Sequence, residues 1–146
     1  MSMKDHCQLP HEALSLVPHR PPMLFVGELL ERSGNIAVGS ATMPESGICT
    51  DVEYDFPEYF VEVVAQTVAM ANGYDAKKNG QEMNDGLFVG IDSFRLFGTV
   101  APGARLRVVT EKTFEFGAVK IIHGDLFCEE QLVAQGDIKV WEDLGE

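Results

Sequence analysis

The residue best suited to chemistry in this chain is Glu62, which lies inside an almost uniformly apolar run at residues 59–71. A carboxylate among valines is costly to bury unless it is paired or neutralised. Gln66 follows four residues later, so on a helix the two polar side chains share one face. Two interpretations stay open: a buried Glu held by a backbone or cross-subunit donor, or a carboxyl that exchanges a proton with a substrate beside it.

Few other residues are placed for catalysis. His19 lies in a proline-rich stretch, where a lone histidine is more often a turn residue than a catalytic one. His123 is expected in a strand whose facing the sequence does not settle. The cysteines are far apart and form no CxxC pair, so we expect reduced thiols at Cys7, Cys49 and Cys128. With no metal-ligand spacing, glycine-rich phosphate loop or G-x-S-x-G turn in the sequence, we expect no metal and no cofactor.

The charge balance limits the partners. The 146 residues carry 11 Lys+Arg and 23 Asp+Glu, a formal net charge of −12. A field of this sign repels phosphate backbones and anionic lipid, which argues against nucleic acid and membrane surfaces. No apolar run reaches the ~18 residues of a membrane-spanning helix, and the start lacks the apolar stretch of a secretory signal. We therefore expect one cytoplasmic domain over residues 1–146, with residues 1–21 as an irregular lead-in.

A long buried helix is the clearest predicted element. Asp55-Phe56-Pro57-Glu58 has the D-x-x-E form of a capping box, with Pro57 in the first turn. The run that follows is apolar nearly all round, which indicates a buried helix rather than a surface one. Lys77 and Lys78 suit a helix C-terminus, and Gly80 follows them. The sequence predicts a helix over residues 55–78.

Strands are predicted on both sides of this helix. Residues 23–30 and 36–42 flank a hairpin turn at 33–35. Later strands are expected at 87–91, around 106–114, at 119–128 and at 132–140, with Lys112 interrupting the alternation of the second. Strands, one buried helix and more strands make an α+β layer pair. Because one sheet cannot cover every face of such a helix, we expect a second subunit to cover the rest.

Three stretches resemble the β-hydroxyacyl-acyl-carrier-protein dehydratases, which have the hot-dog fold. Residues 16–26 (LVPHRPPMLFV) are similar to that family's opening L-P-H-R-x-P-x-L-L-V. Residues 61–66 (VEVVAQ) are similar to its helix motif I-E-A-M-A-Q, and residues 90–106 to its G-I-D…R-F…V-x-P-G-D-x-L. The similarity spans about residues 14–141 in the same order. It implies a long central helix wrapped by an antiparallel β-sheet, and a homodimer or higher even oligomer with the acyl chain along the helix.

The resemblance implies catalytic and substrate-binding roles for several residues, but one catalytic residue of the family has no counterpart in this chain. Glu62 matches the family's catalytic Glu, and Gln66 its neighbouring Gln. The family's catalytic histidine comes fourteen residues before that Glu, where this chain has Ile48. If a gap is allowed, Asp55 is the nearest match, so the histidine is absent either way. Asp55 and His19 then remain as weaker candidates for the missing base.

A second departure concerns the carrier of the acyl group. Where the family tends to place basic residues after Arg95, this chain has Phe97 and Gly98. Docking of an acidic acyl carrier protein should therefore be weaker than usual. We expect Phe97, Gln66 and Ile48 to contact the substrate, an acyl thioester carried by acyl carrier protein or coenzyme A.

Three functions fit these residues, and the fold alone does not choose among them. The first, favoured by the resemblance, is a divergent 3-hydroxyacyl-thioester dehydratase that uses another base. The second is an acyl thioesterase in which Glu62 or Asp55 activates water. The third is a non-catalytic acyl-thioester-binding protein or partner subunit.

Overall fold

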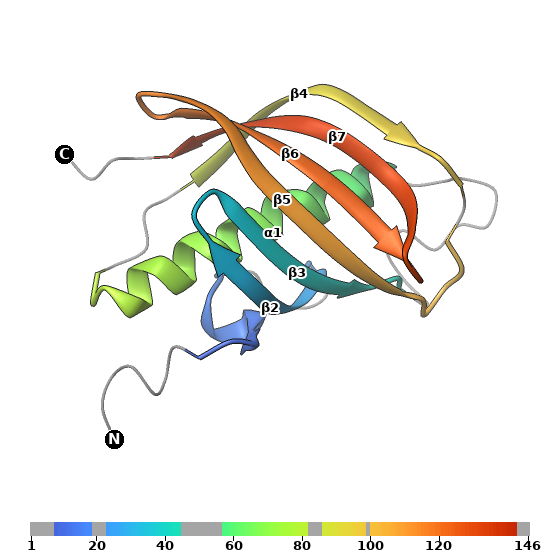
Figure 1. Ribbon diagram of the computed structural model, residues 1–146, viewed down its shortest axis with the longest axis horizontal. Helices are drawn as coiled ribbons and strands as arrows, with labels where there is room; N and C mark the ends of the chain where they lie inside the picture. The colour runs from blue at the N-terminus through green and yellow to red at the C-terminus, as the bar shows by residue number, and fades with distance from the viewer. Residues whose placement is uncertain (1–7, 19–22, 45–56, 82–85, 99, 143–146) are drawn as a thin grey trace.

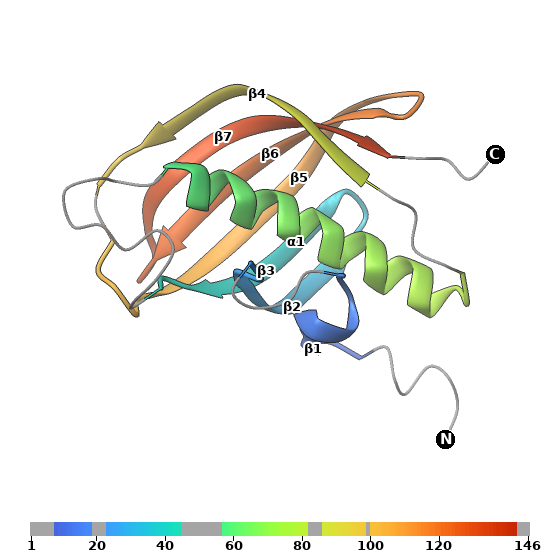
Figure 2. The same cartoon turned by 180° about the vertical axis from the view of Figure 1, so that it is seen from behind.

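One long helix lies across a curved antiparallel sheet (Figures 1 and 2). The computed structural model describes residues 8–18, 23–44, 57–81, 86–98 and 100–142. The elements, in chain order, are β1 (His11–Glu12), the short 3-10 helix η2 (Ala13–Ser15), β2 (Val26–Ser33), β3 (Ile36–Thr42), α1 (Pro57–Lys78), β4 (Gly86–Leu96), β5 (Arg105–Phe116), β6 (Val119–Cys128) and β7 (Gln131–Glu142). The strand order is β1-β2-β3-β5-β6-β7-β4, and each neighbouring pair is antiparallel. The expected α+β class, a helix wrapped by an antiparallel sheet, is confirmed.

The helix forms the centre of the core. Tyr59, Val63, Val64, Thr67 and Met70 are each at most 1% exposed. Burying one large apolar side chain of this kind is worth about 1.5–3 kcal/mol, so the apolar run that predicts the helix also holds it against the sheet. The prediction of a buried helix is confirmed over Pro57–Lys78, while the proposed cap at Asp55 lies outside the described residues.

Two glycines let the helix approach the sheet closely. A Cβ atom on Gly124 of β6 would lie 2.7 Å from a methyl carbon of Val64. A Cβ atom on Gly39 of β3 would lie 2.9 Å from the terminal carbon of Met70. At these two positions, β3 and β6 carry no side chain, which leaves room for Met70 and Val64 of the helix.

Several strand limits differ from the predicted ones. The first predicted strand, 23–30, is displaced to Val26–Ser33, and the strand predicted at 87–91 runs on to Leu96. Lys112 interrupts the apolar alternation because the pairing of β5 with β6 shifts register between Lys112 and Phe114. Such a bulge inserts one extra residue, which moves the side chains that follow to the other face.

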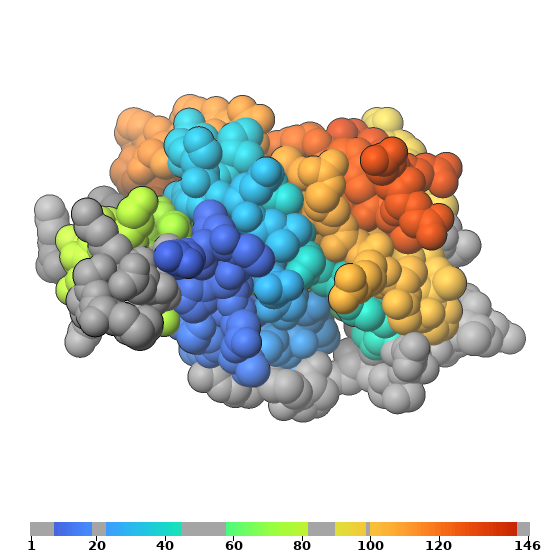
Figure 3. Space-filling view, turned by 60° about the horizontal axis from the view of Figure 1, so that its bottom comes forward, coloured from blue at the N-terminus to red at the C-terminus, as the bar shows by residue number. Residues whose placement is uncertain are grey.

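The predicted lead-in also contains regular structure. β1 pairs with β2, and η2 follows directly. Figure 3 shows this N-terminal segment lying against β2, next to the last turns of α1. Gly73 permits the contact with the helix, since a Cβ atom there would lie 2.0 Å from the carbonyl oxygen of Leu16.

One face of the helix is less covered than the others. Glu62, Ala65, Ala69, Asn72 and Ala76 are only partly buried, and their spacing of three or four residues places them along one stripe. The sheet therefore covers this stripe less completely than the rest of α1. The described helix is not long and apolar enough to cross a membrane.

Candidate functional site

The candidate site is built on Glu62 and Gln66, one turn apart on α1. The Nε2 group of Gln66 donates a hydrogen bond to Oε1 of Glu62 at 3.1 Å. Glu62 is partly buried, whereas Gln66 is 1% exposed. The sequence prediction that the two polar groups share one face is thus confirmed by direct contact.

Gln66 is fixed by the chain that leads into β2. Its Oε1 accepts a hydrogen bond from the Phe25 backbone N–H, and its Nε2 donates to the Met23 carbonyl, both at 2.9 Å. The side-chain amide therefore takes the place of a peptide group beside an extended segment. Because a buried amide is costly to leave unpaired, these bonds restrict Gln66 to one orientation and with it the Glu62 oxygen that it contacts.

Aromatic residues support the first turns of the helix. The Tyr59 hydroxyl donates to the Thr42 carbonyl at 2.9 Å, and the Tyr59 ring packs 5.1 Å from that of Phe25. The ring of Phe60 lies 5.5 Å from that of Tyr59, at an edge-to-face angle of 80°. These contacts attach the N-terminal half of α1 to the start of β2 and the end of β3. They therefore fix the position of the helical turn that carries Glu62.

The remaining predicted site residues are not brought together by the described part of the chain. Ile48, Asp55 and His19 lie outside the described residues. Phe97 follows β4, and its backbone N–H donates to the Val133 carbonyl at 2.9 Å, while its side chain is half exposed. The contributions of Phe97 and Ile48 to substrate binding, and of Asp55 and His19 to catalysis, stay predictions.

Sequence reasoning missed a charged cluster around His123. Its Nδ1 lies 2.9 Å from Asp137 Oδ1, and its Nε2 lies 2.9 Å from Asp125 Oδ1. Partial burial lowers the pKa of His123, but the hydrogen bonds and negative charge of Asp137 and Asp125 outweigh this, so the pKa is raised from its ordinary value of 6.5. Gly124, the next residue, faces α1. His123 therefore faces away from the helix, and we assign this cluster to stability.

Solved structures with the same arrangement identify the fold. A chain of the dehydratase heterocomplex ApeI:P from Xenorhabdus doucetiae matches with a TM-score of 0.78 at 17% identity, covering 94% of this chain and 93% of that one. A Streptococcus mutans protein bound to acetyl CoA matches with a TM-score of 0.65 at 10% identity, covering 88% and 95%. The fold is the hot-dog fold.

Sequence comparisons then give the family. The chain is 33% identical over 139 residues to the 3-hydroxyacyl-[acyl-carrier-protein] dehydratase FabZ of Rhizobium etli, covering 87% of this chain and 84% of the relative. It is 31% identical over 142 residues to FabZ of Bacillus cereus, covering 85% and 93%. The family model of the ApeP-like dehydratases matches residues 11–144. The chain belongs to this ApeP-like dehydratase family and is a divergent, dehydratase-like member of it.

Proposed function

We propose that this protein dehydrates 3-hydroxyacyl thioesters, with Glu62 as the proton donor and Gln66 as its positioning residue. The observation that supports this most directly is the Gln66 amide, which contacts Glu62 Oε1 at 3.1 Å while held by the backbone of Met23 and Phe25. A fixed, partly buried carboxyl on the central helix is suited to a reaction that needs one directed proton transfer. We further propose that the acyl group is carried by an acyl carrier protein, in line with the names of the FabZ relatives, and that the protein acts in the cytoplasm.

The proposed reaction breaks one C–H and one C–O bond. A base removes the proton at C2, which the thioester carbonyl makes acidic. The electron pair forms the C2=C3 double bond, and the hydroxyl leaves C3 with a proton from Glu62 as water. Return of a proton from the base to Glu62 completes the cycle.

The base that removes the C2 proton has not been identified among the described residues, and this suggests a second candidate function. The family's histidine is absent from the sequence, with Ile48 at the ungapped position. In the homodimer, Asp55 or His19 would have to act instead. Alternatively, the chain is the subunit of a mixed complex in which another dehydratase chain supplies the base, a proposal favoured by the likeness to a chain of the ApeI:P dehydratase heterocomplex.

Assembly through the edge strand β4 is compatible with both the homodimer and the mixed complex. This strand ends the sheet order, so one side of its eleven residues has no neighbouring strand within the described chain. Ile91 on this strand is 52% exposed. We propose that a second subunit adds its β4 to this edge and covers the stripe of α1 that carries Glu62, which would close the site at the subunit interface.

A kinetic comparison tests the assignment of Glu62. Purified protein is incubated with 3-hydroxyacyl thioesters of acyl carrier protein and of coenzyme A, and enoyl formation and free thiol are followed separately. Glu62→Gln should lower the rate of enoyl formation by about 10²–10⁴-fold, the range that one acid–base group contributes. Glu58→Gln, an exposed glutamate in the first turn of the same helix, is the matched control and should keep the native rate. Release of thiol without enoyl product would instead identify a thioesterase.

A gain of function tests the role of the missing histidine. We expect the protein alone to dehydrate slowly, since isoleucine moves no proton, and Ile48→His should raise the rate measurably. Adding Glu62→Gln to Ile48→His should remove the gain, because acid and base act as a unit. A native rate equal to that of ordinary dehydratases would show that another base already operates.

A further inference from the structure

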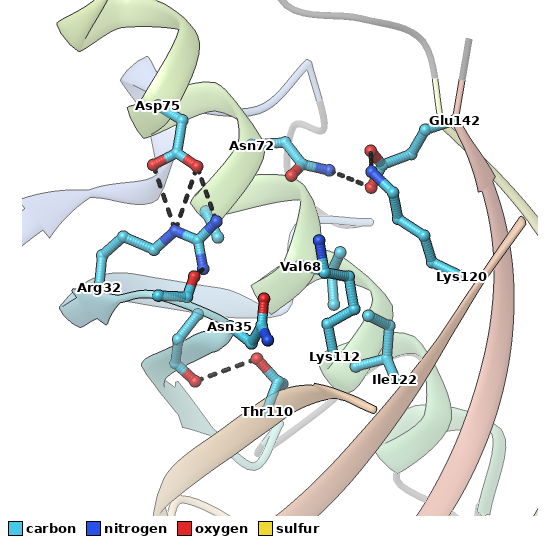
Figure 4. A pocket seen from close by; sticks show the side chains of 13 residues that line it. Arg32, Asn35, Val68, Asn72, Asp75, Thr110, Lys112, Lys120, Ile122 and Glu142 are labelled. Carbon is cyan, nitrogen blue, oxygen red and sulfur yellow. Dashed lines mark hydrogen bonds and ion pairs between the residues drawn. The ribbon is translucent and has the colours of Figure 1, made fainter. Parts of the chain in front are cut away.

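A cavity lies against the C-terminal half of the helix. It has a volume of about 200 Å³ and is lined by residues of the C-terminal half of α1, of the β2–β3 turn and of five strands, β2, β3, β5, β6 and β7 (Figure 4). Asn72 lines it ten residues after Glu62, which corresponds to about 15 Å along the helix axis. Most of its exposed lining is polar, and Ala37, Val68 and Ile122 contribute apolar groups to it. This cavity is separate from the proposed catalytic site.

Two ion pairs fix the walls of the cavity. Arg32 of β2 binds the Asp75 carboxylate through Nη2 at 2.7 Å and Nε at 3.2 Å, and its Nη1 donates to the Ile36 carbonyl. On the opposite wall, the Glu142 carboxylate accepts hydrogen bonds from Lys120 and from the Asn72 amide. Lys120 and Glu142 are 13% and 11% exposed. Neither the buried Lys120–Glu142 pair nor the Arg32–Asp75 pair, whose carboxylate is 41% exposed, is expected to add much net stability, but both hold charged groups in place around the cavity.

Among the cations that line the cavity, Lys112 is the one whose ammonium group has donors available for a ligand. Figure 4 shows its side chain extending from β5 toward α1, between the two fixed pairs. One of its three donors is used by Glu115, at 2.7 Å, but the Glu115 side chain is 46% exposed and lies outside the lining of the cavity. Exposed pairs of this type are weak and screened by solvent. The amide of Asn35, in the turn between β2 and β3, lines the same space.

We propose that this cavity binds a short-chain carboxylate, with the carboxylate group on Lys112 and Asn35 and the few carbons against Ala37, Val68 and Ile122. An ammonium and an amide beside apolar groups provide the charge-assisted bonds and the hydrophobic contact that such a ligand needs. The volume is several times the roughly 30 Å³ of one water molecule. The carboxylates of Asp75 and Glu142 in the walls disfavour a doubly charged anion such as phosphate. The site lies beyond the proposed catalytic function and does not depend on it.

Titration with butyrate, followed by the backbone amide resonances of the full chain, tests this site. The expected result is saturable shifts centred on Asn35, Asn72 and Lys112. Lys112→Gln should weaken binding by roughly tenfold or more, the usual effect of losing a charge-assisted hydrogen bond. Lys139→Gln, which removes a half-exposed lysine of β7 that does not line the cavity, is the matched control and should leave binding unchanged.

Two further ligands test whether the negative charge of butyrate is recognised, and one further variant replaces Lys112→Gln if that variant does not fold. Butyramide has the same shape without the charge and should bind more weakly than butyrate, and inorganic phosphate should also bind more weakly. If Lys112→Gln does not fold, Asn35→Ala serves in its place. Absence of saturable shifts, equal weakening by Lys139→Gln, or phosphate binding as tight as butyrate binding would overturn the proposal.

Discussion

At the scale of single residues, the contribution of Gln66 to stability and to the orientation of Glu62 is best tested by removing its side-chain amide. Gln66→Leu keeps much of the side-chain volume but leaves the Met23 carbonyl and the Phe25 N–H without their partner. An unpaired buried group costs about 1–3 kcal/mol, and because Phe25 is only partly buried and Met23 is exposed, the free energy of unfolding should fall by an amount within that range. Urea unfolding at constant m-value measures the loss.

The control for Gln66→Leu is Gln135→Leu, which removes one hydrogen bond to the partly exposed Asp125 on the opposite face of the sheet. Its effect should be smaller, because water can replace the lost donor. Gln66→Leu should also lower kcat with little change in KM, as expected for a residue that orients Glu62 rather than one that binds substrate. Equal loss of stability in the two variants would contradict a buried anchoring role for Gln66.

His123 makes stability depend on pH, and the direction of the effect is fixed by its pKa. The folded-state pKa is raised above the unfolded value of 6.5 by Asp137 and Asp125. The imidazolium therefore stabilises the fold fully below pH 6.5, and this contribution is lost as the pH rises through the folded pKa. The difference in unfolding free energy between the native chain and His123→Gln should be largest in mildly acidic buffer and shrink in alkaline buffer. A difference that grows with pH would show that the imidazole is held neutral.

The two polar clusters differ in how far sequence could predict them. Glu62 and Gln66 are four residues apart on one helix, so their contact follows from helix geometry alone. His123 and Asp137 meet only because β6 pairs with β7 in one register, in which the two residues stand opposite each other. That register depends on bulges and turn lengths that the composition of a strand does not specify.

At the scale of elements, Gly73 tests how the N-terminal segment is attached to the helix. Alanine is normally the better helix former by about 1 kcal/mol, so Gly73→Ala on an open helix would stabilise. Here the new methyl group would lie 2.0 Å from the Leu16 carbonyl oxygen, and the backbone must move. We expect a net loss of stability of about 1–3 kcal/mol, as for other overpacked sites, measured by thermal or urea unfolding.

The matched control for Gly73→Ala is Gly90→Ala, since a Cβ atom on Gly90 of β4 would have no heavy atom within 4 Å. That variant should fold with nearly native stability. Stabilisation by Gly73→Ala would mean that the segment of β1 and η2 is not packed on the helix in solution.

Most of the elements could be predicted because their patterns are local. The apolar run of α1 and the alternation of β7 each follow from which face is buried. β1 could not be predicted, because its two residues carry no periodicity and form a strand only by pairing with β2. The end of β4 at Leu96 was missed for a similar reason: three consecutive residues, Ile91, Asp92 and Ser93, are all exposed. Exposure of that kind hides the alternation from which strands are recognised.

At the scale of the whole molecule, net charge and assembly act against each other. Two copies of a chain with a net charge of −12 repel, so a stable dimer needs an interface with few unpaired acids and enough apolar area. The edge strand β4 offers backbone groups for pairing, together with the exposed side chain of Ile91. Its neighbour Asp92 is also exposed, which places one carboxylate near the proposed contact.

Ile91→Asp therefore provides the sharpest test of the proposed assembly. It would add a second carboxylate per chain beside Asp92, and a two-fold axis would bring both pairs together at one interface. We expect the dissociation constant to rise at least about tenfold, so that light scattering coupled to size exclusion shifts from dimer toward monomer. Phe116→Asp is the matched control: Phe116 is 77% exposed at the end of β5, away from the β4 edge, and its change should leave the assembly intact. If Phe116→Asp dissociates the protein while Ile91→Asp does not, the subunits meet through the β5–β6 hairpin. The stripe of α1 that carries Glu62 would then have to be completed by a different partner.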